Sequence, residues 1–529
     1  MISLKTLLHM KNFLLSVLFF SIVTNNICST SYYCNPSGGS MNNPGTLTLP
    51  WSTLQAVFIA GKTFADGDVI YLMSGNHGFP TVMGSHTSDV IITRYGSDLP
   101  VLDRVDFGST ASHWVLDNIE VYRSTAPPAV PILTHPVFPL YGNSLVRIIN
   151  AASYITISNC YIYSIEDSSG WTADDWNYKA WNGIYIRGSH NTITNCHIKN
   201  VNFGVYPQEN EYNTVKYCTI ENFCGDGLRP GNNTTLEYNV VKDCYLTNGN
   251  HPDLIQLYTG DDMTNVIIRG NILIAATTSR PFIADLCHGI AGFDGLYTNC
   301  VVENNLVVVH DLQGISFFGA VNCSILNNTV AYNPTGVVPN IVVTACKDGR
   351  LSSGNLVRNN LCPGLTLDAN VGTVDHNVVS TNYTSDYVDY HGFDFHLKST
   401  STAINAGIAT YAPTIDLEQQ VRTITNDAGC YRYLAGNSTY LAPNNSTNLN
   451  FKQVGRKIVI YGFKEQDKGS IANFYNAQGK CVAVFRVDGD VLEWDGLNEL
   501  GSTVAAGLYI VKVYGEQGIC VFKFIMNGR

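Results

Sequence analysis

The residues best suited to catalysis lie between positions 226 and 288. They combine carboxylates, two imidazoles, an amide and a guanidinium: Asp226, Arg229, His251, Asp253, Gln256, Asp261, Asp262 and His288. Cleavage of a uronic-acid polymer by elimination requires a base, a group that neutralises the substrate carboxylate, and a proton donor for the leaving oxygen. This cluster contains candidates for all three functions, and we therefore expect it to form an active site.

For an elimination reaction, the candidate base is Arg229 or His251. Asp253, Asp261 and Asp262 are candidate ligands for Ca²⁺, which binds hard oxygen donors and would neutralise the substrate carboxylate. The alternative explanation for Asp261 and Asp262 is turn formation, because Gly-Asp-Asp is a common turn sequence.

A hydrolase would instead use two carboxylates on adjacent repeats, for which Asp226 and Asp253 are the candidates. His288 occupies the corresponding position in the next repeat and is a further candidate catalytic residue. The surrounding sequence HPDLIQ is not specific to one enzyme class, so elimination, hydrolysis and epimerisation stay open at this point.

A second group of candidate residues is aromatic. The segment 164–181 contains Trp171, Trp176 and Trp181, three of the six tryptophans in the chain. Long irregular insertions in compact proteins are usually functional, and flat aromatic faces suit sugar rings. We predict a carbohydrate subsite here, and the alternative is a loop that buries its own aromatic side chains.

The elements that must position these residues are short repeated strands. Aligned repeats share one column of Asn or Cys: Asn118, Cys160, Cys196, Cys218, Asn239, Asn271, Asn305, Asn328, Asn360 and Asn377. Three steps in this column are 21, 22 and 23 residues, which is the spacing of a solenoid. Because the units are strands without helical periodicity, the fold class is predicted to be an all-β, right-handed parallel β-helix. Buried Asn side chains in successive rungs can hydrogen-bond along the axis.

One strand of each repeat is expected to form the functional face. Inward positions are apolar: Ile184, Val205, Leu228, Ile255, Ile290 and Ile315. Alternation then directs the next residue of each strand outward, as in Tyr185, Tyr206, Arg229 and Gln256, with Tyr258 further along. Asp226, Asp253 and His288 stand at the start of their strands. Consecutive rungs carrying these side chains predict a groove for an extended polymer, with Tyr185, Tyr206, Gln256 and Tyr258 as substrate-binding residues.

Composition limits the partners. The chain has 529 residues and a net charge of −11, whereas a nucleic-acid partner would favour a basic stripe. We therefore expect a polysaccharide substrate or ligand, no nucleic acid, and a monomeric protein.

The chain divides into four parts. Residues 1–29 have the charge and the short apolar run of a signal peptide, and the run is too short to favour a membrane anchor. Residues 31–434 form the β-helix, 435–450 an Asn- and Ser-rich linker, and 451–529 a small antiparallel β-sandwich. The protein is expected to be secreted or displayed on the cell surface.

Two features of the 31–434 segment resemble the pectate-lyase-like superfamily of secreted β-helix proteins. They are the opening YYCNPSGGSMNNPGTLTLPW with GDVIYLMSGNHG, and the closing DFHLKSTSTAINAG with DAGCYRYLAG. The resemblance implies a polysaccharide lyase, a C5-epimerase or a glycoside hydrolase. Neither the Arg-x-Pro-x-x-Arg element of pectate lyases nor the Asp-Pro-His-Asp motif of alginate epimerases is present, so the resemblance covers the scaffold and leaves the reaction open.

The segments FYNAQGKCV, AGLYIVKV and VFKFIMNGR resemble the C-terminal sorting domain of the type IX secretion system of Bacteroidetes-type bacteria. The resemblance implies that residues 451–529 direct export and that the type IX machinery is a partner. The alternative is a carbohydrate-binding sandwich.

Three functions are compatible with the sequence. The first is a polysaccharide lyase acting on an acidic polysaccharide, or another carbohydrate-active enzyme of this scaffold. The second is a non-catalytic glycan-binding adhesin, and the third is a structural spacer. The aromatic loop and the charged outward columns argue against the third.

Overall fold

The computed structural model describes residues 29–526 except 124–143, 208–210, 248–250, 259, 278–286, 333–336, 423–424, 435–448, 455–456, 464–469, 477–480, 498–502, 505–506 and 516–517. The predicted signal peptide and most of the predicted linker lie outside the described residues. Within the described part, no helix has the length and apolar character needed to cross a membrane.

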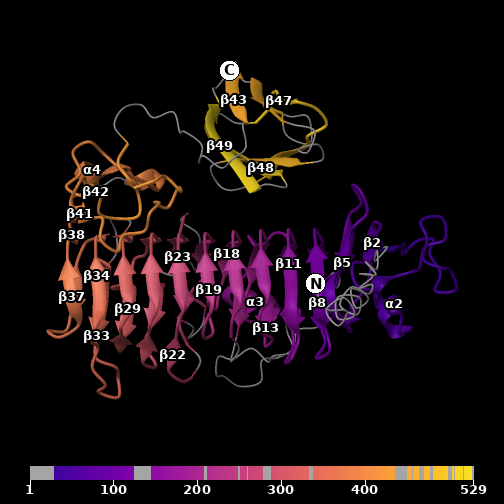
Figure 1. Cartoon of the computed structure of the whole chain (residues 1–529), viewed down its shortest axis with the longest axis horizontal. Helices are drawn as coiled ribbons and strands as arrows, with labels where there is room; N and C mark the ends of the chain where they lie inside the picture. Colours follow the sequence, from indigo (N-terminus) through magenta and orange to yellow (C-terminus); the bar gives the residue numbers. More distant parts are fainter. Residues whose placement is uncertain are drawn as a thin grey trace, which may run out of the picture.

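Three long parallel sheets wind into a right-handed β-helix, as predicted (Figure 1). Sheet 1 contains β1 (Ser31–Cys34), β2 (Val69–Leu72), β5 (Ser85–Arg94), β8 (Ser112–Asp117), β11 (Ser153–Ser158), β14 (Thr192–Thr194), β17 (Thr214–Lys216), β19 (Thr235–Glu237), β23 (Ile267–Arg269), β27 (Val301–Glu303), β31 (Ser324–Leu326), β34 (Asn355–Arg358) and β37 (Gly372–Asp375). Sheet 2 contains β3 (Gly75–Asn76), β6 (Pro100–Leu102), β9 (Glu120–Val121), β12 (Tyr161–Tyr163), β15 (His197–Val201), β18 (Thr219–Phe223), β20 (Val240–Cys244), β24 (Ile272–Ile274), β28 (Leu306–Val308), β32 (Thr329–Ala331), β35 (Leu361–Cys362) and β38 (Val378–Val379).

Sheet 3 carries the candidate site and consists of two pieces. The first piece contains β4 (Thr81–Val82), β7 (Val105–Phe107), β10 (Ser144–Ile148), β13 (Asn182–Ile186) and β16 (Val205–Pro207), and the second contains β21 (Asp253–Gln256), β25 (His288–Gly292), β29 (Gln313–Phe318), β33 (Asn340–Thr344) and β36 (Leu365–Leu367). Single bridges from Val205 to Leu228 and from Leu228 to Ile255 join them. The turn into this sheet is tight, since a Cβ on Gly204 would lie 2.3 Å from the carbonyl oxygen of Gly227.

The predicted inward column is confirmed. Ile184, Val205, Leu228, Ile255, Ile290 and Ile315 lie side by side on successive rungs and are fully buried. Every second side chain of each short strand therefore packs into one continuous apolar core. The removal of this apolar surface from water stabilises the fold.

The Asn ladder between sheets 1 and 2 is also confirmed, with one correction. From Asn239 to Asn377, each side-chain oxygen accepts hydrogen bonds from the residue one rung earlier, at 2.9–3.0 Å. The prediction that Asn118 belongs to the column is wrong. Asn118 has a φ of 58° and corresponds to Asn159 of the next rung, which lies one residue before the column. Ile119 occupies the column instead, and its carbonyl accepts the backbone N–H of Tyr161. On most rungs the residue just before the column has a positive φ, a backbone conformation that Asn tolerates well. Asn therefore occurs both in the column and one residue before it, so these two positions look alike in sequence.

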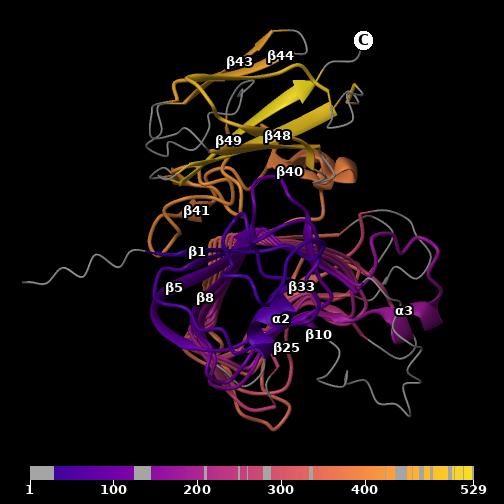
Figure 2. The same ribbon diagram turned by 90° about the vertical axis from the view of Figure 1, so that its right-hand side faces the viewer.

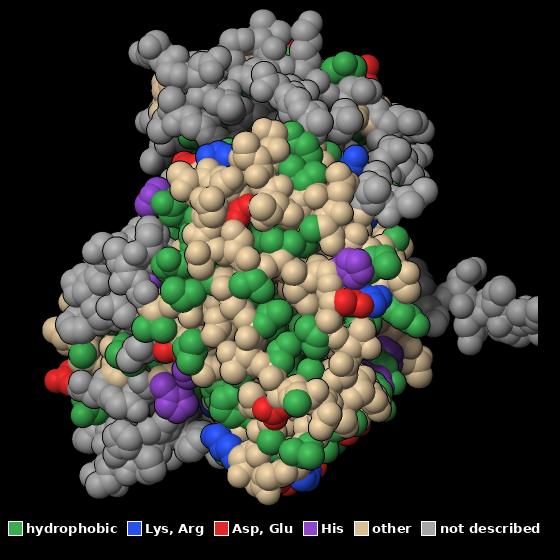
Figure 3. Space-filling view, turned by 90° about the vertical axis from the view of Figure 1, so that its left-hand side faces the viewer, with side chains coloured by type: hydrophobic (Ala, Val, Ile, Leu, Met, Phe, Trp, Pro, Cys, Tyr) green, Lys and Arg blue, Asp and Glu red, His purple; other side chains and the backbone are tan. Residues whose placement is uncertain are grey.

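The two ends of the β-helix differ. Helix α2 (Leu54–Ile59) lies across the N-terminal end and buries Leu54 and Val57 (Figure 2). At the opposite end, Val374 and Val379 of the last rung are exposed, and charged side chains on that end are sparse (Figure 3). A terminal lobe packs on the outer side of sheet 2 through Tyr383, Tyr387 and Phe395 rather than across the end. Its elements are α4 (Tyr383–Asp386), β39 (Tyr387–Asp389), the 3₁₀ turn η1 (Tyr390–Gly392), β40 (Asp394–Leu397), β41 (Gly407–Ile408) and β42 (Thr425–Asn426).

Small antiparallel sheets form the C-terminal part. One contains β43 (Asn450–Val454), β44 (Lys457–Tyr461) and β47 (Val491–Trp494), and the other β45 (Ile471–Asn476), β46 (Cys481–Arg486), β48 (Gly507–Gly515) and β49 (Gly518–Met526). They bury their own core, which includes Ile458, Phe474 and Trp494. The remaining short strands, β22 (Met263–Thr264), β26 (Tyr297–Thr298) and β30 (Ala320–Val321), pair beyond sheet 3.

Candidate functional site

The register of sheet 3 stacks the charged candidates on successive rungs. Asp253 pairs with His288 of the next strand. Asp226 lies one rung earlier, because the backbone N–H of Asp253 donates to its Oδ1 at 3.0 Å. The sequence prediction that these three residues share one column is therefore confirmed.

The central contact is between a buried carboxylate and a partly exposed imidazole. Nδ1 of His288 lies 2.6 Å from Oδ1 of Asp253, which has no solvent exposure. The His288 side chain is 20% exposed, and its Nε2 lies 3.5 Å from Asp311. Asp253 therefore fixes the orientation of the ring, and part of the ring remains exposed.

The electrostatics of the pair favour a protonated His288. Burial alone would lower the pKa of His288, but the hydrogen bond to Asp253 and the negative charges of Asp253, Asp311 and Asp226 outweigh it and raise that pKa. Burial also raises the pKa of the Asp253 carboxyl, against the opposing effect of the hydrogen bond from His288. An imidazole whose pKa is raised keeps its proton to a higher pH than an ordinary imidazole and can donate it.

Arg229 is held rather than free to accept a proton. Its Nε donates to Oδ2 of Asp226 at 2.6 Å, and its guanidinium lies 5.0 Å from the centre of the Phe203 ring and 5.4 Å from that of Tyr258. Both members of the ion pair are buried. A guanidinium held by a buried carboxylate between two aromatic rings fits the role of a fixed cation better than the predicted role of a base.

His251 lies beside the central pair. Its ring centre is 6.5 Å from that of His288, and the residue is exposed. Two imidazoles at this separation, one of them oriented by a carboxylate, form an acid–base pair that can act on one substrate molecule. The alternative pair of hydrolytic carboxylates is poorly placed, since both Asp226 and Asp253 are buried.

The predicted calcium ligands do not come together. Asp262 is exposed and accepts two hydrogen bonds from Arg350, at 2.5 and 2.8 Å, while Asp253 is buried at the start of β21. The hydrogen bonds from Arg350 lower the pKa of Asp262 to about 2. Among the described residues, no group of three or more His, Cys, Asp or Glu side chains is arranged to hold a metal. Asp253, Asp261 and Asp262 therefore do not form a site that fits Ca²⁺, and the chemistry proposed below does not involve this ion.

The aromatic loop is partly a structural element. Helix α3 (Ala173–Lys179) begins with a capping box between Thr172 and Asp175 and stands out from the side of the β-helix (Figure 2). Trp176 is only 1% exposed and stacks on Tyr245, with ring centres 4.3 Å apart. The prediction that Trp176 offers a ring face to a sugar is wrong, because that face is covered. Trp171 and Trp181 are partly exposed.

Three predicted binding residues on sheet 3 point outward but are covered. Tyr185 and Tyr206 pair across the strands, with ring centres 5.0 Å apart, and form a small buried cluster with Phe203. Gln256 is also buried, and among the described residues its Oε1 has no hydrogen-bond partner. The prediction that these side chains lie open in a groove is therefore corrected.

Sequence reasoning missed a group of arginines on the same outward column. Arg147 pairs with Tyr185 on one side and with Asp106 on the other. Nε of Arg104 and Nε of Arg147 lie 3.0 and 2.9 Å from the same oxygen of Asp106. The signal for Arg147 is its outward position in the apolar strand β10, one residue before the end of that strand.

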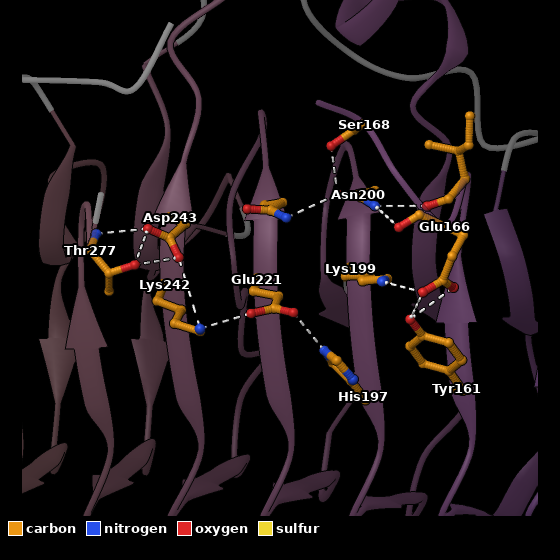
Figure 4. A network of polar contacts seen from close by, with 12 residues as sticks. Tyr161, Glu166, Ser168, His197, Lys199, Asn200, Glu221, Lys242, Asp243 and Thr277 are labelled. Carbon is orange, nitrogen blue, oxygen red and sulfur yellow. Dashed lines mark hydrogen bonds and ion pairs between the residues drawn. The ribbon is translucent and has the colours of Figure 1, made fainter. Parts of the chain in front are cut away.

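A second polar cluster lies on the outer face of sheet 2 (Figure 4). Lys199 binds Glu166 at 2.8 Å, and Glu221 binds both His197 and Lys242 at 2.8 Å. Each charge in this network has an opposite partner, so the network is neutralised internally.

The comparison with protein families agrees with the fold. A family model described as a right handed beta helix region matches residues 142–330. No curated protein matches the chain. Similar solved structures include pectate lyase Pel9A (15% identity, TM-score 0.42, 77% of this chain and 97% of that one), a rhamnogalacturonan lyase (16%, 0.40, 78% and 97%) and a PL6 family polysaccharide lyase from Pseudopedobacter saltans (14%, 0.41, 66% and 90%). The chain is a right-handed parallel β-helix protein, and identities this low say nothing about its reaction.

Proposed function

We propose that this protein is a carbohydrate-active enzyme that cleaves an acidic, uronic-acid-containing polysaccharide by β-elimination. The observation that carries the proposal is the Asp253–His288 pair, in which a buried carboxylate orients a partly exposed imidazole and raises its pKa. A protonated imidazole fixed on a sheet face is suited to donating a proton to a glycosidic oxygen.

In the proposed reaction, His251 removes the proton on the carbon next to the uronate carboxylate. The electron pair of that bond forms the new carbon–carbon double bond, and the bond to the glycosidic oxygen breaks. His288 gives its proton to this oxygen as the oxygen leaves, so the two imidazoles exchange protonation states. Arg229 is a fixed positive charge on the same face and stabilises the negative charge that develops on the carboxylate.

Asp253 and Asp226 act as positioning residues in this scheme. Asp253 holds His288, and Asp226 holds both Arg229 and the backbone N–H of Asp253. Hydrolysis would require two carboxylates that reach the substrate on opposite sides of the bond, whereas both of these carboxylates are buried. The geometry therefore favours elimination over hydrolysis.

The test is incubation of the protein with polygalacturonate, alginate, hyaluronan and rhamnogalacturonan, while the absorbance of unsaturated uronide products is recorded. A matched neutral polymer such as xylan controls for scattering. We expect at least one acidic polymer to yield unsaturated ends. New reducing ends without unsaturation would identify a hydrolase instead. Binding without any cleavage would identify a glycan-binding adhesin.

We also propose that the protein is exported and that residues 451–529 carry the export signal. The support is the sequence resemblance of this segment, together with its own apolar core separate from that of the β-helix. The test compares cell fractions for the full chain and for a chain ending at residue 434 in a bacterium with a type IX system. We expect the shortened chain to accumulate inside the cell as a folded β-helix, and normal surface display of that chain would contradict the assignment.

A further inference from the structure

Two partly exposed aromatic side chains lie beside the acid–base pair, and the proposed reaction does not use them. Phe293 directly follows β25 and Phe318 is the last residue of β29, so the register places them on neighbouring rungs. Their ring centres are 5.0 Å apart. The ring centre of His288 lies 5.2 Å from that of Phe293, with an angle of 83° between the ring planes. Phe293 and Phe318 together are called the aromatic platform below.

The aromatic platform is separate from the apolar core. Among the described residues, neither phenylalanine belongs to a buried apolar cluster or packs against one. Each of the two side chains keeps part of its surface exposed. Exposed apolar surface is unfavourable in water, and beside polar groups that can do chemistry it is typical of a ligand-binding surface. Packing of the core therefore does not account for the aromatic platform.

The two imidazoles and the aromatic platform follow one another along the β-helix, and each has exposed surface. His251 lies before β21 and is exposed, His288 begins β25 and is 20% exposed, and Phe318 lies one rung further. In the proposed reaction, His251 takes a proton from the uronate and His288 protonates the glycosidic oxygen. The sugar that leaves with this oxygen therefore lies on the side of His288 away from His251, where the aromatic platform is.

The charges near the aromatic platform favour a neutral sugar over a second uronate. A carboxylate oxygen of Asp311 lies 3.5 Å from Nε2 of His288. The ammonium of Lys347 lies 5.9 Å from the centre of the Phe293 ring, but it is paired with Asp294 at 2.6 Å. A substrate carboxylate at this place would be repelled by Asp311. A neutral sugar avoids this repulsion and can pack the C–H groups of one face on an aromatic ring.

We propose that the aromatic platform binds the sugar that leaves with the glycosidic oxygen, and that this sugar is neutral. The substrate class is then a polysaccharide in which a neutral sugar is attached to the O4 oxygen of each uronate. The inference rests on the proposed function, because it assigns the two sides of the cleaved bond to two parts of one site. Stacking of the leaving sugar would hold the glycosidic oxygen beside His288.

The test compares three substitutions of one ring. Phe318→Ala removes the side chain, Phe318→Leu keeps apolar volume without the ring, and Phe318→Tyr keeps the ring. Phe79→Ala is the matched control, because Phe79 is a 37% exposed phenylalanine between β3 and β4. Each variant is also made together with His251→Ala, so that binding is measured without cleavage. Thermal midpoints check that the variants are folded.

Binding is measured by affinity electrophoresis. The gels contain hyaluronan or rhamnogalacturonan, in which uronates alternate with neutral sugars, or polygalacturonate or alginate, which consist of uronates. We expect an alternating polymer to retard the protein most, and Phe318→Ala and Phe318→Leu to weaken this binding about tenfold, while Phe318→Tyr and Phe79→Ala leave it unchanged. A loss no larger than that of Phe79→Ala, stronger retardation by a uronate-only polymer, or no retardation by any polymer would overturn the proposal.

Cleavage is measured separately, in the chains that keep His251, from the absorbance of unsaturated products. A higher KM of Phe318→Ala on an alternating polymer supports the aromatic platform. Weaker binding by Phe318→Ala without unsaturated products from any polymer supports the platform as a sugar-binding surface and refutes the elimination. Unsaturated products with unchanged binding and KM in Phe318→Ala retain the elimination and refute the platform.

Discussion

Replacement of Asn271 by leucine is the sharpest test of how the β-helix is held together. The Asn271 side chain is fully buried, and its Oδ1 accepts the backbone N–H and the side-chain amide of Asn239, both at 3.0 Å. Its Nδ2 donates to the carbonyl of Leu236 at 2.9 Å. Asn271→Leu leaves the backbone N–H of Asn239 and the carbonyl of Leu236 without these partners, whereas the side-chain amide of Asn239 keeps its hydrogen bond to the carbonyl of Val215. At about 1–3 kcal/mol for each of these two buried groups, the expected loss in free energy of unfolding is about 2–6 kcal/mol.

The same substitution at the end of the ladder provides the control. Asn377 accepts two hydrogen bonds from Asn360 and donates one to Val357, but it is only partly buried and water can replace these bonds. We expect Asn377→Leu to cost only about 1 kcal/mol. Unfolding in urea, followed by tryptophan fluorescence, compares the two variants with the unmodified protein. Equal losses at the two positions would refute the argument that burial of the ladder sets the cost.

Three further predictions follow from buried or strained side chains. Trp176→Ala should lower the free energy of unfolding by about 3–5 kcal/mol through lost packing on Tyr245, with little change in glycan affinity, as thermal melts and calorimetry would show. Tyr154 has a φ of 56°, so Tyr154→Asn should destabilise the protein less than Tyr154→Ala, by about 1 kcal/mol in urea unfolding, because Asn tolerates this conformation better. Burial opposes protonation of His396, but hydrogen bonds, the first of them to Asp394, raise its pKa to about 9. Because the pKa of His396 is higher in the folded than in the unfolded protein, its protonation stabilises the folded state. This stabilisation is fully present below the unfolded pKa near 6.5 and is lost as the pH rises through about 9. The difference in melting temperature between the unmodified protein and His396→Asn should therefore be present at pH 6 and absent at pH 10.

The fold could be predicted from the sequence because each rung repeats the same constraints. The period of the Asn column fixed the number of residues per turn, and strand alternation placed Ile184 and Ile255 inward. The column of Asp226, Asp253 and His288 followed from the same register. The error at Asn118 arose where two neighbouring positions both favour Asn.

Burial on the outer face could not be predicted in the same way. Alternation specifies that Tyr185 and Gln256 point away from the core, but loops of irregular length decide whether an outward side chain is exposed. The partners of Asp262 and Arg147 come from residues distant in sequence, such as Arg350 and Asp106. No local pattern encodes these contacts, so the ion pairs of Asp262 and Arg147 could not be predicted from the sequence.

The central claim is that Asp253 raises the pKa of His288 and thereby keeps it protonated for catalysis. The direct measurement is the pH dependence of kcat/KM on the acidic polymer that is cleaved, for the unmodified protein, Asp253→Asn and His288→Gln. Activity that depends on protonated His288 persists until the pH exceeds its raised pKa. We expect Asp253→Asn to move the alkaline limb of the profile to lower pH, and His288→Gln to reduce kcat/KM by about 10²–10⁴-fold with a folded protein. An unchanged alkaline limb in Asp253→Asn, or full activity in His288→Gln, would contradict the assignment.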